Sequence, residues 1–155
     1  MEKQSPEEIT KWDRWFAGEA NNLAWTLAEN PHRTASEREE MLRAAHAAAW
    51  HWSRIGTELH QARADLLLGL AYALAGHGSL AMTYARRSYD YLTSHQSPDW
   101  EIALAHAVLA HAACAAQEKA LHATHYASAR SLGEAIADPE EREIFRRTFD
   151  QLPTP

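Results

Sequence analysis

The sequence predicts an all-α fold, on three observations. Alanine is the commonest residue and valine occurs once, at Val108, so helix formers are abundant and strand formers are scarce. Short serine- or aspartate-led motifs that start helices occur at four places. Between them, apolar residues recur three and four positions apart, as they do on one face of a helix. With 155 residues, 46% hydrophobic and 23% charged, the chain suits a single domain over 1–155.

Seven helices are expected, at about 6–29, 36–55, 58–75, 79–94, 98–116, 119–136 and 139–150. Four starts offer side-chain oxygens to free backbone N–H groups of the first turn: Ser5 with Glu8, Ser36 with Glu39, Ser97, and Asp138 with Glu141. Stops are expected at Asn30, at Gly56, at Gly76 to Gly78 and at Gln117. Because most connections are short, successive helices should pack as antiparallel pairs.

Apolar spacing predicts the buried face of three helices. The expected core positions of the first helix are Trp12, Phe16, Ala20, Leu23 and Leu27. Those of the second are Met41, Ala45, Ala48, Trp52 and Ile55, so Trp52 is predicted to be a core residue. The last helix carries Ile144, Phe145, Phe149 and Leu152 on one side, and we expect it to cap the end of the fold.

The middle of the chain contains an internal repeat. "LLGLAYALAGHGSLAMTYA" from Leu67 aligns with "VLAHAACAAQEKALHATHY" from Val108, and "LAWTLAE" from Leu23 echoes "LAYALAG" from Leu70. In the first alignment, small and apolar residues coincide along both helices of each pair. Three related helix pairs followed by a final helix predict a short helical-repeat array.

The second helix pair resembles a tetratricopeptide repeat. Leu68-Gly69 is similar to the leucine-glycine of that family, Tyr72 to its tyrosine, Gly76 to its turn glycine and Ala81 to its small residue. Asp65 departs from the tryptophan that is usual in the family. The resemblance implies a concave surface, formed by the first helix of each pair, that binds a protein or peptide. Residues expected on that surface are Asn21, Asn22, Trp25, Gln61, Asp65, Tyr72, His106 and Ala110.

A polar-aromatic surface is predicted on the first two helices. Trp25 and Trp50 both lie off the predicted core faces, and tryptophan is enriched where proteins bind partners. The residues proposed to form the partner site are Asn22, Trp25, Arg43, His46 and Trp50, together with Tyr72. A histidine in such a site would make binding sensitive to pH near 6–7, because its ordinary pKa is about 6.5. The alternative is that these residues only pack against neighbouring helices.

Other functions receive less support from the sequence. A helical enzyme or metal-binding protein using His46, His51, His106 or His111 stays an alternative, but no metal-ligand motif is present, so we expect neither a metal nor another cofactor. A homo-oligomer that buries its surplus aromatic residues against a second copy is another alternative. The net charge of −6 disfavours nucleic acid as a partner. The lone cysteine and the lack of a signal peptide or membrane span predict a cytoplasmic, non-enzymatic protein.

Overall fold

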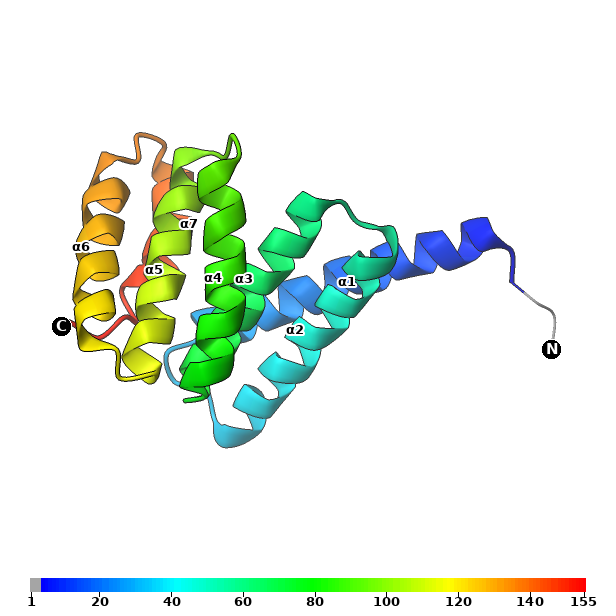
Figure 1. Ribbon diagram of the computed structural model, residues 1–155. Coiled ribbons are helices and arrows are strands. Elements are labelled where there is room, and N and C mark those ends of the chain that lie inside the picture. The colour runs from blue at the N-terminus through cyan, green and yellow to red at the C-terminus, as the bar shows by residue number, and fades with distance from the viewer. Residues whose placement is uncertain (1–3) are drawn as a thin grey trace.

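The computed structural model describes residues 4–155 (Figure 1). These residues form seven helices and no strand. The helices are α1 (Pro6–Glu29), α2 (Ala35–Ile55), α3 (Glu58–Leu74), α4 (Gly78–Ser94), α5 (Asp99–Ala115), α6 (Lys119–Ala135) and α7 (Pro139–Phe149). Successive helices pack side by side as hairpins. The all-α hairpin array with a short C-terminal helix is therefore confirmed.

Side-chain caps start several helices as the sequence predicts. Ser5 forms a capping box with Glu8, and Asp138 accepts hydrogen bonds from the first-turn N–H groups of α7. The predicted box of Ser36 and Glu39 is wrong, because the N-cap of α2 is Thr34, which forms a capping box with Glu37. Two overlapping capping patterns occur in this segment, and the earlier one is used. The N-cap of α5 is Pro98, not Ser97.

The internal repeat is visible in the bounds of the helices. All four helices α3 to α6 are 17 residues long. The pair α5–α6 begins and ends 41 residues after the pair α3–α4, as 58 to 99 and 94 to 135 show. Gly69 allows α3 and α4 to approach closely, because a Cβ atom there would lie 2.9 Å from the backbone nitrogen of Ala85.

The first helix buries a different face from the one predicted. Its buried face is formed by Ala17, Ala24 and Ala28, whereas Trp12 and Phe16 are about half exposed. Small alanine side chains let α1 pack closely on the rest of the molecule, so the aromatic residues are turned outward. Leu23 is exposed as well, and Leu27 is buried as expected. The first turns of α1 also extend past all the other helices, α2 included (Figure 1).

The second helix confirms only part of its predicted core face. Met41, Ala45 and Ala48 are fully buried, but Trp52 is only half-buried and Ile55 is likewise intermediate. The Trp52 ring stacks on the His60 ring, with centroids 4.4 Å apart, across the turn between α2 and α3. The prediction of Trp52 as a core residue is wrong, because the last turn of α2 lies at the edge of the packed region.

The last helix does more than cap the final pair. Phe145 and Thr148 are buried, and α7 also reaches the first helix. Arg147 forms an ion pair with Glu29 at 3.3 Å, and the Gln151 amide donates to the backbone oxygen of Ala28 at 3.0 Å. The residues from α7 onward therefore contact both the last pair and the end of α1. None of the helices in 4–155 is long and apolar enough to cross a membrane.

Candidate functional site

A pocket of about 340 Å³ lies where α1, α3, α5 and α7 meet. We call it the inner pocket. The polar and aromatic side chains that line it are Asn21, Asn22, Trp25 and Glu29 from α1, Arg63 from α3, and Trp100 and Glu101 from α5. Its volume falls within the range of small-ligand and side-chain pockets in proteins. The three helices that supply these residues are the first helices of the three pairs, as expected for the concave side of such an array.

Glu101 is the unusual group of the inner pocket. It is 3% exposed, and Arg63 donates from Nη2 to its Oε1 at 2.5 Å. Its other oxygen, Oε2, is buried and has no hydrogen-bond partner among the residues that the structure describes. A buried acceptor left without a partner costs about 1–3 kcal/mol. The pocket is therefore lined by a residue that lacks one hydrogen bond, and a donor group of a ligand reaches Oε2 only after the side chains around it move.

The other residues of the inner pocket suit a cationic or amphipathic group. Trp25 and Trp100 are partly buried against the core, and each leaves part of its ring at the pocket. Indole faces attract ammonium and guanidinium groups. The side chains of Asn21 and Asn22 are joined only by a long 3.5 Å hydrogen bond, so their amides can also bond to a ligand. Carboxylate, indole and amide groups thus converge on one volume.

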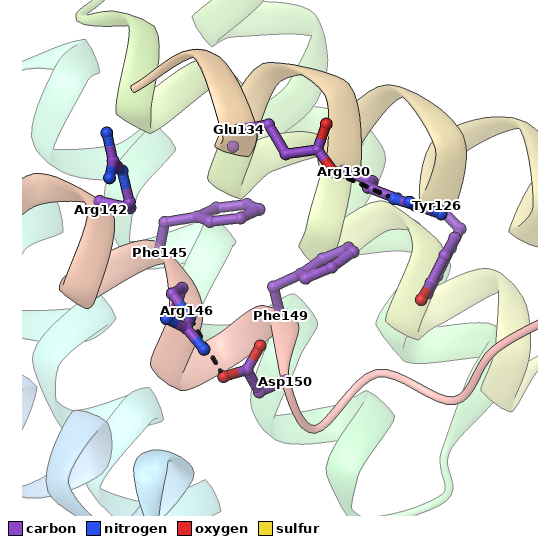
Figure 2. A pocket seen from close by; sticks show the side chains of 9 residues that line it. Tyr126, Arg130, Glu134, Arg142, Phe145, Arg146, Phe149 and Asp150 are labelled. Atoms are coloured by element: carbon purple, nitrogen blue, oxygen red, sulfur yellow. Dashed lines mark hydrogen bonds and ion pairs between the residues drawn. The ribbon is translucent and has the colours of Figure 1, made fainter. Parts of the chain in front are cut away.

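A second pocket lies in the contact between α6 and α7 (Figure 2). Its charged groups already have partners within the protein: Arg130 pairs with Glu134, Arg146 pairs with Asp150, and Arg142 donates to the backbone oxygen of Ile136. The rings of Phe145 and Phe149 stack beside each other there, with centroids 5.1 Å apart. Gly133 admits Phe145, whose ring occupies the space that a Cβ at Gly133 would need. This pocket is a packing seam, and we assign it no ligand.

The six residues predicted to bind a partner occupy four places. Asn22 and Trp25 line the inner pocket. The His46 ring and the Tyr72 hydroxyl form a hydrogen bond of 2.7 Å, so these two residues meet between α2 and α3. Arg43 is exposed and pairs with Glu39 on its own helix.

Trp50 lies at the far end of the α1–α2 hairpin from Trp25. The Arg54 guanidinium lies over the Trp50 ring, and Arg54 in turn bonds to Asp13. Asp13 and Trp25 are separated by twelve residues of α1, which correspond to about 18 Å along a helix. The structure therefore does not bring Trp25, His46 and Trp50 together into one surface.

The four histidines of the metal hypothesis have separate partners. His46 contacts Tyr72, and His51 contacts Asp13. His106 and His125 are hydrogen-bonded through their Nδ1 atoms at 2.9 Å, and burial lowers the pKa of His106 to about 4. His111 donates from Nε2 to the backbone oxygen of Thr148. Within residues 4–155, no three metal-ligating side chains come together.

Four polar or aromatic residues of the inner pocket were missed by sequence reasoning: Glu29, Arg63, Trp100 and Glu101. A signal for Glu101 was available, because it precedes the most apolar segment of the chain, "IALAHAVLAHAA", where a charge needs a partner. The partner itself could not be found, because Arg63 lies 38 residues earlier on another helix. Comparison of the chain with protein-family models, with curated proteins and with solved structures gives no match.

Proposed function

We propose that this protein is a non-enzymatic binding module that takes a segment of a protein or peptide into the inner pocket. The segment would present a basic side chain or a terminal amine to Glu101. The observation that carries the proposal is the buried Oε2 of Glu101, which has no partner in the described structure, beside two indole rings. An ammonium or guanidinium group would satisfy this oxygen and contact Trp25 and Trp100 at once.

The arrangement of the helices supports the same proposal. The inner pocket lies on the side of the array formed by the first helices of the three pairs. The tetratricopeptide resemblance of 58–94 implies a binding surface on that side. The net charge of −6 favours a basic partner over an acidic one and over nucleic acid. The single cysteine fits a reducing compartment, so we place the module in the cytoplasm.

The proposal is tested with short capped peptides that differ only at a central residue. Binding of lysine, arginine, leucine and glutamate peptides is followed by backbone amide NMR shifts. We expect the lysine and arginine peptides to shift amides around Trp25 and Trp100, and the glutamate and leucine peptides to leave them unchanged. Equal shifts with all four peptides, or shifts elsewhere only, would contradict the proposal.

Two glutamate variants distinguish a specific role of Glu101 from the effect of the protein's overall negative charge. Glu101→Gln keeps the side chain's shape and leaves Arg63, which is half exposed, free to be solvated. Loss of one charge-assisted bond of about 1.5–3 kcal/mol should weaken the basic peptides by about tenfold to a hundredfold. Glu134→Gln is the matched control, because Glu134 is also a glutamate paired with an arginine but lies on exposed α6. It should bind as the wild type does.

A further inference from the structure

A large apolar surface is exposed at the other end of the molecule, on the free part of α1. We call it the aromatic surface, and it consists of Ile9, Trp12, Trp15, Phe16 and Trp50, which are 42–57% exposed. Its rings form a continuous group. Trp12 contacts Trp15 and Phe16, Phe16 stacks on His51, and His51 contacts Trp50. Single exposed apolar residues are ordinary, but a contiguous group of this kind marks an interaction site.

The aromatic surface is held in place by a buried carboxylate. Asp13, which is 6% exposed, accepts hydrogen bonds from His51 at 2.7 Å and from Arg54 at 2.9 Å. His51 then supports the Phe16 ring, and the Arg54 guanidinium lies 5.0 Å from the centre of the Trp50 ring. Side chains that are already ordered lose little entropy on association. The surface is thus organised before any partner arrives.

The position of this surface on α1 leaves it without a helix to cover it. Ala17, Ala24 and Ala28 form the face that α1 turns to the rest of the molecule. Trp12, Trp15 and Phe16 are exposed and lie in the N-terminal half of the helix, whose first turns extend past the other helices (Figure 1). At the opposite end of the chain, α7 covers the last pair. The two ends of the described array therefore differ, because the most exposed aromatic rings, those of Trp12, Trp15, Phe16 and Trp50, lie at the first one.

We propose that a second copy of this chain covers the aromatic surface, in a symmetric dimer. A fully exposed aromatic side chain has about 150–250 Å² of surface. Four rings that are about half exposed, together with Ile9, therefore offer roughly 500 Å² of apolar area. A stable interface needs about 800 Å² from each partner, with a polar rim around the apolar centre. The polar side chains beside the surface on α1 and α2 would form the rim and would have to contribute the remaining area, roughly 300 Å². A twofold contact hides the same surface on both copies, so no other protein is required.

The charges around the aromatic surface agree with self-association. Glu8 and Glu19 flank the tryptophans on α1, and Arg54 lies at Trp50 on α2. Lys11 and Arg14 lie on the same part of α1, so in a twofold contact the glutamates of one copy can face these basic side chains of the other, while Arg54 stays paired with Asp13. A lipid surface is disfavoured, because helices that lie on membranes carry lysine and arginine on the polar face, whereas this helix begins with two glutamates and the chain is acidic.

The test is the molar mass of the full chain in solution, measured by light scattering and by sedimentation over a range of concentrations. Interfaces of this size have dissociation constants of about 1 µM or tighter. The wild type should therefore be a dimer, and Trp12→Gln/Trp15→Gln should weaken the dimer at least tenfold while its circular dichroism stays helical. Leu80→Gln is the matched control, because Leu80 is similarly exposed but lies on α4. It should dimerise as the wild type does.

Three results would overturn the proposal. The first is a wild type that is monomeric at about 100 µM, well above the expected dissociation constant. The second is a dimer that the double tryptophan variant leaves unchanged, which would place the interface elsewhere. The third is a monomer that binds vesicles of anionic lipid and loses this binding in the double variant, which would make the aromatic surface a lipid contact. If the double variant loses its helical signal, Trp15→Gln alone replaces it, because Trp15 is the more exposed of the two rings.

Discussion

Gly76 and Gln117 occupy the same left-handed backbone position in two successive helix pairs, with φ of 81° and 62°. The residue before each, Ala75 and Ala116, also has nearly the same φ and ψ in both pairs. The two helix pairs therefore share both the spacing of their apolar residues and the backbone conformation of their turns. Glycine adopts this conformation at no steric cost, whereas glutamine does so with strain.

Gln117→Gly should stabilise the protein. Removing the side chain relieves the left-handed strain, and we expect a gain of about 1 kcal/mol, reduced somewhat by the greater freedom of glycine in the unfolded chain. Gly76→Gln, the reverse change in the earlier pair, should lower stability. Urea midpoints of the two variants measure both effects. A lower midpoint for Gln117→Gly would show that the Gln117 side chain stabilises its turn.

Met41→Ala should cost more stability than Trp52→Ala. Met41 is fully buried, and emptying a buried methionine costs about 2–5 kcal/mol. Trp52 is half-buried and contacts mainly the His60 ring, so its loss leaves no cavity in the core. The free energies of unfolding from equilibrium denaturation decide the order. The opposite order would mean that the edge between α2 and α3 contributes more than the buried face of α2.

Stability should fall as the pH is lowered from about 6.5 toward 4. Burial lowers the pKa of His111 to about 4 from 6.5, with Arg33 and His122 nearby adding to the effect. The unfolded chain therefore binds a proton in this window that the folded chain does not, which favours unfolding. His111→Gln should flatten the dependence of the denaturation midpoint on pH. His32→Gln is the control, because His32 lies in an exposed loop. It should leave the dependence of the denaturation midpoint on pH unchanged.

Arg63→Gln should destabilise the protein and make it more responsive to cations. Without Arg63, the buried Glu101 carboxylate loses the hydrogen bond to Oε1, at a cost of about 1–3 kcal/mol. A lysine or arginine peptide could then replace the lost partner, so its thermal stabilisation should be larger than in the wild type. Differential scanning fluorimetry with and without peptide measures both effects. A variant as stable as the wild type would show that water satisfies Glu101.

The positions of the helices could be predicted closely, because caps, glycines and apolar spacing are local signals. Every helix begins and ends within one residue of its expected range. The buried face of α1 could not be predicted in the same way. Apolar periodicity assigned the core to Trp12, Phe16 and Leu23, but the alanines form it. Hydrophobicity ranks tryptophan above alanine, whereas close packing of two helices favours the small residue.

The candidate site was found from the sequence only in part. Asn22 and Trp25 were predicted, and they do lie in the inner pocket. Their companions Arg63, Trp100 and Glu101 come from helices whose distance from α1 depends on the curvature of the array. That curvature depends on packing between pairs, which a single sequence does not encode in any short motif. His46 and Trp50 lie apart from Trp25 for a different reason: in the antiparallel hairpin Trp50 lies beside the start of α1, near Asp13, and His46 contacts Tyr72 of α3.

The contact between α7 and α1 limits how this architecture can change in length. In an open row of repeats, each unit touches only its neighbours, so a pair can be added or removed at little cost to the rest. Here Arg147 and Gln151 contact Glu29 and Ala28, more than a hundred residues earlier. An inserted helix pair would separate these partners and open the inner pocket that α7 helps to line. An array whose last helix contacts its first one therefore has a fixed number of helix pairs, and changes in length are tolerated in its loops rather than by the addition of repeats.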